Sequence, residues 1–423
     1  MTAIRLGIAG LGTVAQGVLS ILQRNGPQIN QRGGCELVVS RIASRTPKPE
    51  VNLLGAAFST DLEDLLADDV DVIVELIGGE TVAKDLIEQA LRQGKPVVTA
   101  NKAVIANHGN QLFGTNDGVP LKFEAAVAGA IPIIQAVTQG LVANQFESLM
   151  GIINGTCNYI LTAMAEEGAA FEDALARAQE LGYAEADPTF DVGGIDAAHK
   201  LAILLALAFD QPFDFAALYV EGITQITPED IRYAGELGYC IKHLGIARRV
   251  EAGIEARVHP TLVPNDNLLT SVNGVLNAVQ VISDAAGTTL FSGPGAGGEA
   301  TASAVLADIV AVAAQLNASP AGAGGRVLSD VAVLPIGEVC CPHYLRIPTR
   351  DEAGVFARVA EAMSRHEISI EAVIQKEPTT EFASIVLLTE PVLEAQIVAA
   401  CDEVQQLPQV AGTVARIRVE PGH

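Results

Sequence analysis

Basic residues are scarce in this sequence. Lysine and arginine together number 26 among 423 residues, against 50 aspartates and glutamates, so the formal net charge is −24. A surface of that sign repels phosphate backbones and anionic lipid surfaces. We therefore expect neither nucleic acid nor membrane among the partners of this chain.

Long apolar runs and paired cysteines are also missing. Hydrophobic residues make up 49% of the chain, yet Asp308 interrupts the best candidate for the ~18-residue run that a membrane span requires. Residues 1–8 lead directly into an apolar pattern without the features of a signal peptide, so we expect a cytoplasmic protein. The cysteines have neither metal-ligand spacing nor a CxxC pair, which predicts reduced thiols, no disulfide and no zinc. They are Cys35, Cys157, Cys240, Cys340, Cys341 and Cys401.

The length predicts more than one domain, because single cores stop growing near ~250 to 300 residues. Up to residue 130, short apolar runs alternate with helical patterns, which indicates an α/β fold with a Rossmann-type parallel sheet. The expected strands are 4–10, 36–43, 71–76, 96–100 and 120–124. Residues 131–292 change to longer helices and then to β-like stretches at 256–263 and 275–283, as in an α+β domain.

The last third of the chain divides into two parts. A glycine-rich turn at 293–298 introduces a helix over 299–316, which we expect to return to the first domain, followed by an Ala/Gly-rich linker at 318–325. The order in 343–423 is strand, helix, strand, strand, helix, strand, which predicts a ferredoxin-like domain. The expected domains are therefore 1–130 with 293–325, 131–292, and 343–423.

A glycine-rich turn follows the first expected strand and opens the first helix. Gly10 and Gly12 occupy the first two positions of the dinucleotide fingerprint and Ala15 the third, where close helix packing is the requirement. The second strand ends without the acid that would bind the ribose hydroxyls of NAD. Arg45, with Lys48, is available for a 2′-phosphate instead. The pattern favours NADP, with NAD as an alternative.

Two further segments carry side chains suited to catalysis. Lys102 follows the fourth strand at the carboxyl edge of the expected sheet, where open α/β folds bind ligands. Residues 181–200 hold Glu185, Asp191, Asp196 and Lys200, and helical spacing places Asp196 and Lys200 on one face. Such a cluster suits a small zwitterion and a proton transfer. Its structural alternative is a helix cap with a surface ion pair.

Taken in order, these motifs resemble those of homoserine dehydrogenase. The resemblance rests on residues 10–14 (GLGTV), 99–102 (TANK), 154–159 (NGTCNY), 182–200 and 295–298 (GAGG), and it extends over essentially the whole chain. It implies reversible hydride transfer between L-homoserine and L-aspartate 4-semialdehyde with NAD or NADP, a step towards threonine and methionine. It also implies that residues 343–423 form an ACT domain, the amino-acid-sensing module of feedback-regulated enzymes.

The resemblance assigns roles to individual residues. Lys200 is the expected general acid/base, and Lys102 lies near the reacting oxygen and the cofactor, so which lysine carries the proton stays open. A lysine can accept that proton when burial or a second ammonium lowers its pKa from ~10.4. Glu185 is expected to bind the substrate ammonium, Asp196 to orient the substrate or Lys200, and Asp191 to support them. The expected cofactor residues are Gly10, Gly12, Thr13, Val14, Arg45, Thr99, Lys102 and Gly298.

Further expectations come from the resemblance alone. Backbone carbonyls at Glu124, Val127, Gly129 and Ile131 are expected to bind a sodium ion, a hard cation that suits oxygen ligands. Threonine is the expected effector at the ACT domain, although Ala353 replaces the proline that commonly precedes Gly354. The chain is expected to form a homodimer or a larger homo-oligomer.

Three alternatives remain open. One is a related oxidoreductase for another small amino-acid semialdehyde. The second is a catalytically silent protein that senses NADP and an amino acid, which the intact Lys102, Glu185, Asp196 and Lys200 disfavour. The third is a thiol nucleophile at Cys157. Hydride transfer from an alcohol needs no covalent intermediate, so the sequence disfavours that nucleophile as well.

Overall fold

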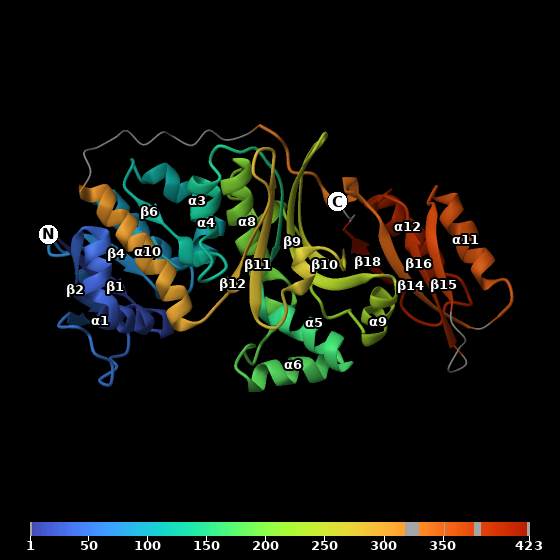
Figure 1. Cartoon of the computed structure of the whole chain (residues 1–423), viewed down its shortest axis with the longest axis horizontal. Coiled ribbons are helices and arrows are strands. Elements are labelled where there is room, and N and C mark those ends of the chain that lie inside the picture. Colours follow the sequence, from blue (N-terminus) through green and yellow to red (C-terminus); the bar gives the residue numbers. More distant parts are fainter. Residues whose placement is uncertain (1, 318–329, 351, 376–381, 421–423) are drawn as a thin grey trace. The chain divides into compact units, whose positions relative to one another are not determined.

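The computed structural model describes residues 2–317, 330–350, 352–375 and 382–420 (Figure 1). Its contacts group the chain into two units. Unit 1 contains Met1–Glu147, Ala198–Ala216 and Asn277–Asp330, and unit 2 contains Ser148–Ala197, Ala217–Leu276 and Val331–His423. The linker expected at 318–325 lies outside the described residues.

The centre of unit 1 is a six-stranded sheet in the order β3-β2-β1-β4-β5-β6, with every neighbouring pair parallel. This is the Rossmann order, which reverses direction between β1 and β4. All five strands expected from the sequence are confirmed, and the short β3 is an addition. The strands are β1 (Thr2–Ala9), β2 (Cys35–Ala43), β3 (Ala57–Ser59), β4 (Val72–Glu75), β5 (Val97–Thr99) and β6 (Leu121–Lys122).

Helices complete unit 1, and the helix after the glycine-rich turn packs against the first helix (Figure 1). Buried residues of both helices share one core cluster with β1, β2 and β4, so the expected return of that helix to the first domain is confirmed. The helices are α1 (Thr13–Gly33), α2 (Thr81–Arg92), α3 (Lys102–Thr115), α4 (Ile133–Gln135) and α10 (Gly298–Asn317). The remaining elements are η1 (Glu63–Leu66), η2 (Glu124–Ala126), η3 (Ala136–Gly140), η4 (Phe215–Ala217) and the paired strands β11 (Leu276–Ser283) and β12 (Gly287–Pro294).

By length and composition, α10 is apolar enough over Gly298–Leu316 to cross a membrane. The helix nevertheless carries Asp308 near its middle, and its buried residues, Val305 and Ile309 among them, lie in the core that it shares with α1. Its apolar character is therefore accounted for by packing in unit 1.

Unit 2 is built on a mixed sheet in the order β7-β9-β10-β18-β14-β16-β15, with β8 also paired to β10. Its first part contains the strands β7 (Phe146–Ile152), β8 (Tyr219–Val220), β9 (Tyr239–Val250) and β10 (Gly253–Pro264). Its helices are α5 (Gly155–Glu167), α6 (Phe171–Glu180), α7 (Thr189–Val192), α9 (Pro228–Glu236) and η5 (Leu268–Ser271), and α8 (Ile195–Phe209) begins there. Of the two β-like stretches expected in 131–292, one is β10 and the other is β11.

The C-terminal segment has the predicted order of strands and helices. Its elements are β14 (His343–Arg350), α11 (Val355–Arg365), β15 (Ile370–Gln375), β16 (Phe382–Thr389), α12 (Glu394–Gln405) and β18 (Ala415–Val419), preceded by η6 (Ile336–Glu338) and by β13 (Cys340–Cys341), which pairs with β17 (Val392–Leu393). The order β18-β14-β16-β15, antiparallel throughout, is that of a ferredoxin-like module. Parallel pairing of Thr261 with Arg418 and of Leu262 with Val419 joins it to β10.

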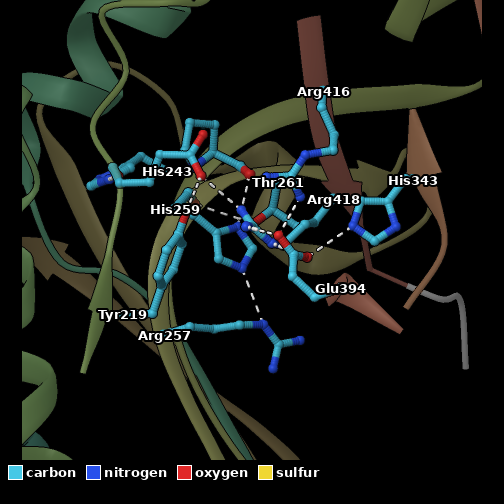
Figure 2. A network of polar contacts seen from close by, with 11 residues as sticks. Tyr219, His243, Arg257, His259, Thr261, His343, Glu394, Arg416 and Arg418 are labelled. Carbon is cyan, nitrogen blue, oxygen red and sulfur yellow. Dashed lines mark hydrogen bonds and ion pairs between the residues drawn. The ribbon is translucent and has the colours of Figure 1, made fainter. Parts of the chain in front are cut away.

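A buried polar network lies at this junction (Figure 2). Arg418 donates from Nε to one oxygen of Glu394 at 2.9 Å and from Nη2 to the other at 2.5 Å, and its Nη1 donates to Glu221 at 2.8 Å. His343 Nε2 lies 3.0 Å from the same Glu394 carboxylate. Burial alone would raise the pKa of Glu394, but the hydrogen bonds from His343 and Arg418 hold it well below its usual range. The Arg418–Glu394 pair therefore links β18 to α12 within the module, and the bond from Arg418 to Glu221 links the module to the first part of unit 2.

A second buried carboxylate makes a similar connection. Asp230 accepts hydrogen bonds from Tyr344 Oη at 3.1 Å and from Arg346 Nε at 2.6 Å, and it closes a capping box with Thr227 at the start of α9. Asp230 has no exposed surface. Its carboxylate satisfies donors from both parts of unit 2.

We predict that Asp230→Ala lowers the free energy of unfolding by about 3 kcal/mol, because the mostly buried Arg346 then keeps only the more exposed Glu229, at 3.4 Å, as its counter-charge. The matched control is Arg177→Ala, which removes an ion pair with Glu167 in which both side chains are nearly half exposed, and it should cost at most about 1 kcal/mol. Urea unfolding of the three proteins measures the difference. Equal, small losses in both variants would contradict a connecting role for Asp230.

Candidate active site

The turn after β1 leaves a helix N-terminus open to a ligand. Gly10 has φ +94°, and a Cβ there would stand 2.7 Å from the Leu76 carbonyl oxygen, so the position requires glycine. Gly12 is the N-cap of α1 and supplies no side-chain cap. The first N–H groups of α1 are therefore available to a phosphate, as the fingerprint predicts.

A second helix begins at the same place. A Cβ on Gly298, the first residue of α10, would stand 2.9 Å from Thr13 Cγ2, and a Cβ on Gly17 would stand 2.6 Å from the Gly298 carbonyl oxygen. The structure thus brings Thr13 and Gly298, expected to bind the cofactor, into contact. Val14 packs partly buried against the core beneath them. Arg45 is exposed directly after β2.

The carboxyl ends of β4 and β5 hold a residue to which the sequence had assigned no role. Glu75 ends β4 with no exposed surface, and its carboxylate accepts hydrogen bonds from Thr99 Oγ1 at 2.5 Å and from the Ile77 N–H at 2.9 Å. Burial raises the pKa of Glu75, and these donors oppose that shift. The available signal was an acid at the end of an otherwise apolar strand. Lys102 begins α3 three residues beyond Thr99 and is half-buried.

In unit 2, Asn154 gathers two of the expected carboxylates. Its Nδ2 donates to Asp191 Oδ1 and to Asp196 Oδ2, both at 2.8 Å, while its Oδ1 accepts the Cys157 N–H and caps α5. Thr156 Oγ1 donates to the Tyr183 carbonyl at 2.7 Å, beside Asp191. The sequence had included Asn154 in a motif without giving it a role. The structure makes it the residue that holds Asp191 and Asp196 together.

The remaining residues expected to act on the substrate differ in burial. Asp196 is 5% exposed and Lys200 is 8% exposed, and the two are spaced four residues apart on α8, as the periodicity predicts. Glu185 lies exposed between α6 and α7, where its backbone carbonyl accepts from Gln179. An exposed carboxylate suits recognition of a charged group that arrives from solvent. The Cys157 thiol is fully buried and donates to the Asp191 carbonyl at 3.3 Å, which does not suit a nucleophile.

The segment expected to bind sodium is a buried turn in unit 1. Ala128 and Gly129 both have left-handed backbones, at φ +54° and +57°, which is costly for alanine. Among the described residues, none donates a hydrogen bond to the carbonyl oxygens of Val127 or Gly129, whereas those of Glu124 and Ile131 accept bonds from Val127 and Ile133. Two free carbonyls in a strained, buried turn fit a hard cation.

The side chain of Glu124 caps a helix, whereas its backbone carbonyl is a candidate cation ligand. Its two carboxylate oxygens accept the N–H groups of Ile134 and Gln135 at 2.8 Å, at the start of α4. Burial raises its pKa to about 7 although both donors favour the charged form. A cavity of about 420 Å³ beside it is lined mainly by apolar side chains and includes no expected catalytic or cofactor residue. The cavity is therefore separate from the site, despite its size.

The described residues bring no three of His, Cys, Asp and Glu together in a way that would hold a metal ion. All six cysteines are free thiols. In the part of the chain that the structure describes, clustered side chains therefore make hydrogen bonds and ion pairs. The candidate ligands of a cation are backbone carbonyls.

Comparison with known proteins finds similarity over the whole length of the chain. The profile of the homoserine dehydrogenase family matches residues 132–310, and that of the homoserine dehydrogenase NAD binding domain matches residues 10–118. The homoserine dehydrogenases of Pseudomonas aeruginosa and Neisseria gonorrhoeae are 48% and 44% identical, with at least 99% of each chain covered.

Solved structures give the same result. The crystal structure of a homoserine dehydrogenase from Thiobacillus denitrificans is similar with a TM-score of 0.95 and 49% identity, covering 99% of both chains. A hyperthermophilic archaeal homoserine dehydrogenase in complex with NADPH is 25% identical with a TM-score of 0.63, covering 74% of this chain and 98% of that one. Because identities near one half extend over nearly every residue, this chain belongs to the homoserine dehydrogenase family of NAD(P)-dependent oxidoreductases.

Proposed function

We propose that this chain oxidises L-homoserine to L-aspartate 4-semialdehyde, and catalyses the reverse reaction, with NADP preferred over NAD and with Lys200 as the acid/base. The observation that carries the proposal is the fixed pair Asp191 and Asp196, held by one amide of Asn154 at the start of the helix that carries Lys200. Asp191 is partly buried on α7, and the buried Asp196 is followed one helical turn later on α8 by the buried Lys200. Two carboxylates and a lysine in this arrangement suit a substrate with an ammonium and a hydroxyl group.

The reaction separates a hydride from a proton. When bound, the nicotinamide supplies the acceptor for the hydride that leaves C4 of homoserine. Lys200 takes the hydroxyl proton in the oxidation and returns it in the reduction, and Lys102 polarises the reacting oxygen. Glu185 binds the substrate ammonium, while Asp196, fixed by Asn154, orients the substrate or Lys200. The N–H groups at the start of α1 and the adjoining start of α10 bind the pyrophosphate.

The cofactor preference and the cation are supported by separate features. Arg45 is exposed at the end of β2, where NAD enzymes place an acid, and a related structure is described as a complex with NADPH. The free carbonyls of Val127 and Gly129, with those of Glu124 and Ile131, hold a sodium ion that stabilises the turn. No step of the reaction passes through that ion.

The proposed regulation rests on the C-terminal module, and the proposed cytoplasmic location rests on the free cysteines. Residues 343–423 act as an ACT domain that binds threonine, with Gly354 in a left-handed turn at φ +85° before α11. Three functional regions, 1–130 with 293–325, 131–292 and 343–423, operate in a homo-oligomer. Free thiols fit a reducing cytoplasm. A threonine titration that leaves the initial rate unchanged would contradict the regulatory role.

Lys200→Ala should lower kcat for NADP reduction by L-homoserine by about 10²- to 10⁴-fold, because the hydroxyl proton loses its acceptor. The binding of NADPH, followed by its fluorescence, should stay within about threefold of wild type. Absorbance at 340 nm measures the rate. A variant that keeps more than a tenth of the wild-type kcat would move the proton transfer to another group, with Lys102 as the first candidate.

Arg45→Ala should raise the KM for NADP by about tenfold or more, since a charged hydrogen bond contributes roughly 1.5–3 kcal/mol. The KM for NAD, which has no 2′-phosphate, should change by less than about twofold. Arg92→Ala, at an exposed position in the last turn of α2, is the control. If both KM values are unchanged by Arg45→Ala, the preference for NADP does not come from this residue.

Asn154→Asp should reduce kcat/KM for L-homoserine by about tenfold or more. Aspartate caps α5 as well as asparagine does, but it removes the donor and adds a third negative charge beside Asp191 and Asp196. Asn154→Ser keeps the cap without adding a charge and should lose less. Steady-state kinetics and melting temperatures of both variants are the measurements. Equal kinetic losses would contradict this account, because both variants keep the cap and the added negative charge of aspartate would then have no effect.

A further inference from the structure

Glu75 connects two loops at the carboxyl edge of the unit 1 sheet. One carboxylate oxygen accepts the Ile77 N–H, in the loop that follows β4, and the other accepts Thr99 Oγ1, at the end of β5. The backbone carbonyl of Glu75 also accepts the Ala100 N–H at 3.4 Å. A single buried residue therefore binds groups on both neighbouring loops.

The hydrogen bonds continue from Thr99 towards Lys102. Thr99 Oγ1 accepts the Asn101 N–H at 2.9 Å while it donates to Glu75, so both functions of this hydroxyl group are in use. Asn101 Oδ1 caps α3 by accepting the Val104 N–H, and its Nδ2 donates to the Gly79 carbonyl at 2.7 Å. The position of Lys102, the first residue of α3, is thereby fixed through Asn101 and Thr99 to Glu75.

Packing alone does not explain a carboxylate at position 75, because burying a carboxyl group costs free energy. The preceding residues Val72, Ile73 and Val74 are completely buried, and an apolar side chain would continue that core without the cost of removing a carboxyl group from water. A carboxylate instead offers two acceptor oxygens that face two different loops. The arrangement of those loops is therefore what the residue determines.

The sheet order says which part of a bound dinucleotide these loops adjoin. The glycine turn after β1 and the Arg45 loop after β2 lie on one side of the reversal between β1 and β4, and β4 and β5 lie on the other. In sheets of this order the dinucleotide crosses the reversal, with its pyrophosphate at the first turn. The β4 and β5 loops therefore belong to the nicotinamide half of the site.

We propose that Glu75 is a positioning residue for the reaction, holding the segment from Thr99 to Lys102 against the loop after β4 so that Lys102 and the nicotinamide keep their reactive geometry. The proposal rests on the proposed function, in which Lys102 polarises the reacting oxygen, and on the cofactor contact expected of Thr99. Glu75 itself touches neither substrate nor cofactor. It acts through the hydroxyl group of Thr99 and the backbone of residues 76–79.

The test compares two buried carboxylates of unit 1. Glu75→Gln keeps the shape of the side chain but replaces one acceptor oxygen by a donor that faces Thr99 Oγ1. Glu88→Gln is the matched control, because Glu88 is 7% exposed and bonds to Gln111 of α3 from the middle of α2, away from the sheet edge. Both variants are measured as full-length protein for kcat with L-homoserine, for NADPH affinity and for melting temperature.

Displacement of a catalytic group by about 1 Å can cost about 10²-fold in rate. We expect kcat of Glu75→Gln to fall by about 10- to 100-fold, with NADPH affinity within about fivefold of wild type, because the pyrophosphate turn is unchanged. Glu88→Gln should keep kcat within about twofold. A Glu75→Gln protein that matches Glu88→Gln in kcat, or that loses activity only in proportion to folded protein, would overturn the proposal.

A double-mutant cycle with Thr99 separates the two residues. Thr99→Ser keeps the hydroxyl group and should retain at least about a third of the wild-type kcat, whereas Thr99→Val should lose as much as Glu75→Gln. Because both substitutions break the same hydrogen bond, the double variant should lose little more than either one. Losses that multiply would show that Thr99 acts independently and would overturn the proposal. If the wild-type enzyme reduces no NADP with L-homoserine, the proposed function fails, and the role of Glu75 fails with it.

Discussion

The parallel pairing of β1 with both β2 and β4 is the constraint on which the cofactor site depends. Parallel strands present all their carboxyl ends at one edge, and the reversal of strand order beside β1 leaves room there for a ligand. Gly10 follows β1 in a backbone conformation that suits glycine, Arg45 follows β2, Glu75 ends β4 and Thr99 ends β5. Residues distant in sequence meet at this edge because each one terminates a neighbouring strand.

In unit 2, a side chain rather than a sheet edge fixes the position of the candidate site residues. Asp191 and Asp196 would repel each other if nothing lay between them, and the Asn154 amide donates one hydrogen to each. The same asparagine caps α5 through its oxygen, so a single side chain sets the start of one helix and the spacing of two acids. Within unit 2, the C-terminal module is joined to the first part by the ion pairs of Arg418 with Glu221 and of Arg346 with Asp230, and by the pairing of β10 with β18. A shift of the module would separate these charges, so the contacts fix its position against the first part of unit 2.

The sequence predicted elements whose signals are local. Five strands of the parallel sheet, the return of α10 and the βαββαβ order of the C-terminal segment were predictable because each depends on periodicity and glycine position within a short window. β3 was not predicted, because it is a short edge strand whose pairing with residues 41–43 of β2 no local pattern indicates. The roles of Glu75 and Asn154 could not be predicted, because they depend on residues distant in sequence. Glu75 bonds to Thr99, 24 residues away, and Asn154 bonds to Asp196, 42 residues away, and only folding brings each pair within hydrogen-bond distance.

The pairing of β10 with β18 could not be predicted from the sequence either. It joins residues 261–262 to residues 418–419, and no local pattern indicates which strand of the module will add to an existing sheet. Lys102 lies at the start of α3, after the carboxyl end of β5, as its place in the sequence predicted, and Glu185 lies in an exposed loop; their roles stay predictions.

The central claim is that a hydride passes directly from C4 of L-homoserine to the nicotinamide while a lysine takes the hydroxyl proton. L-homoserine with both C4 hydrogens replaced by deuterium tests the hydride transfer in one measurement with the wild-type enzyme and NADP. The account predicts that the reduced cofactor, analysed by mass spectrometry, carries one deuterium. Reduced cofactor without the label, or no reduction of NADP at all, would contradict it.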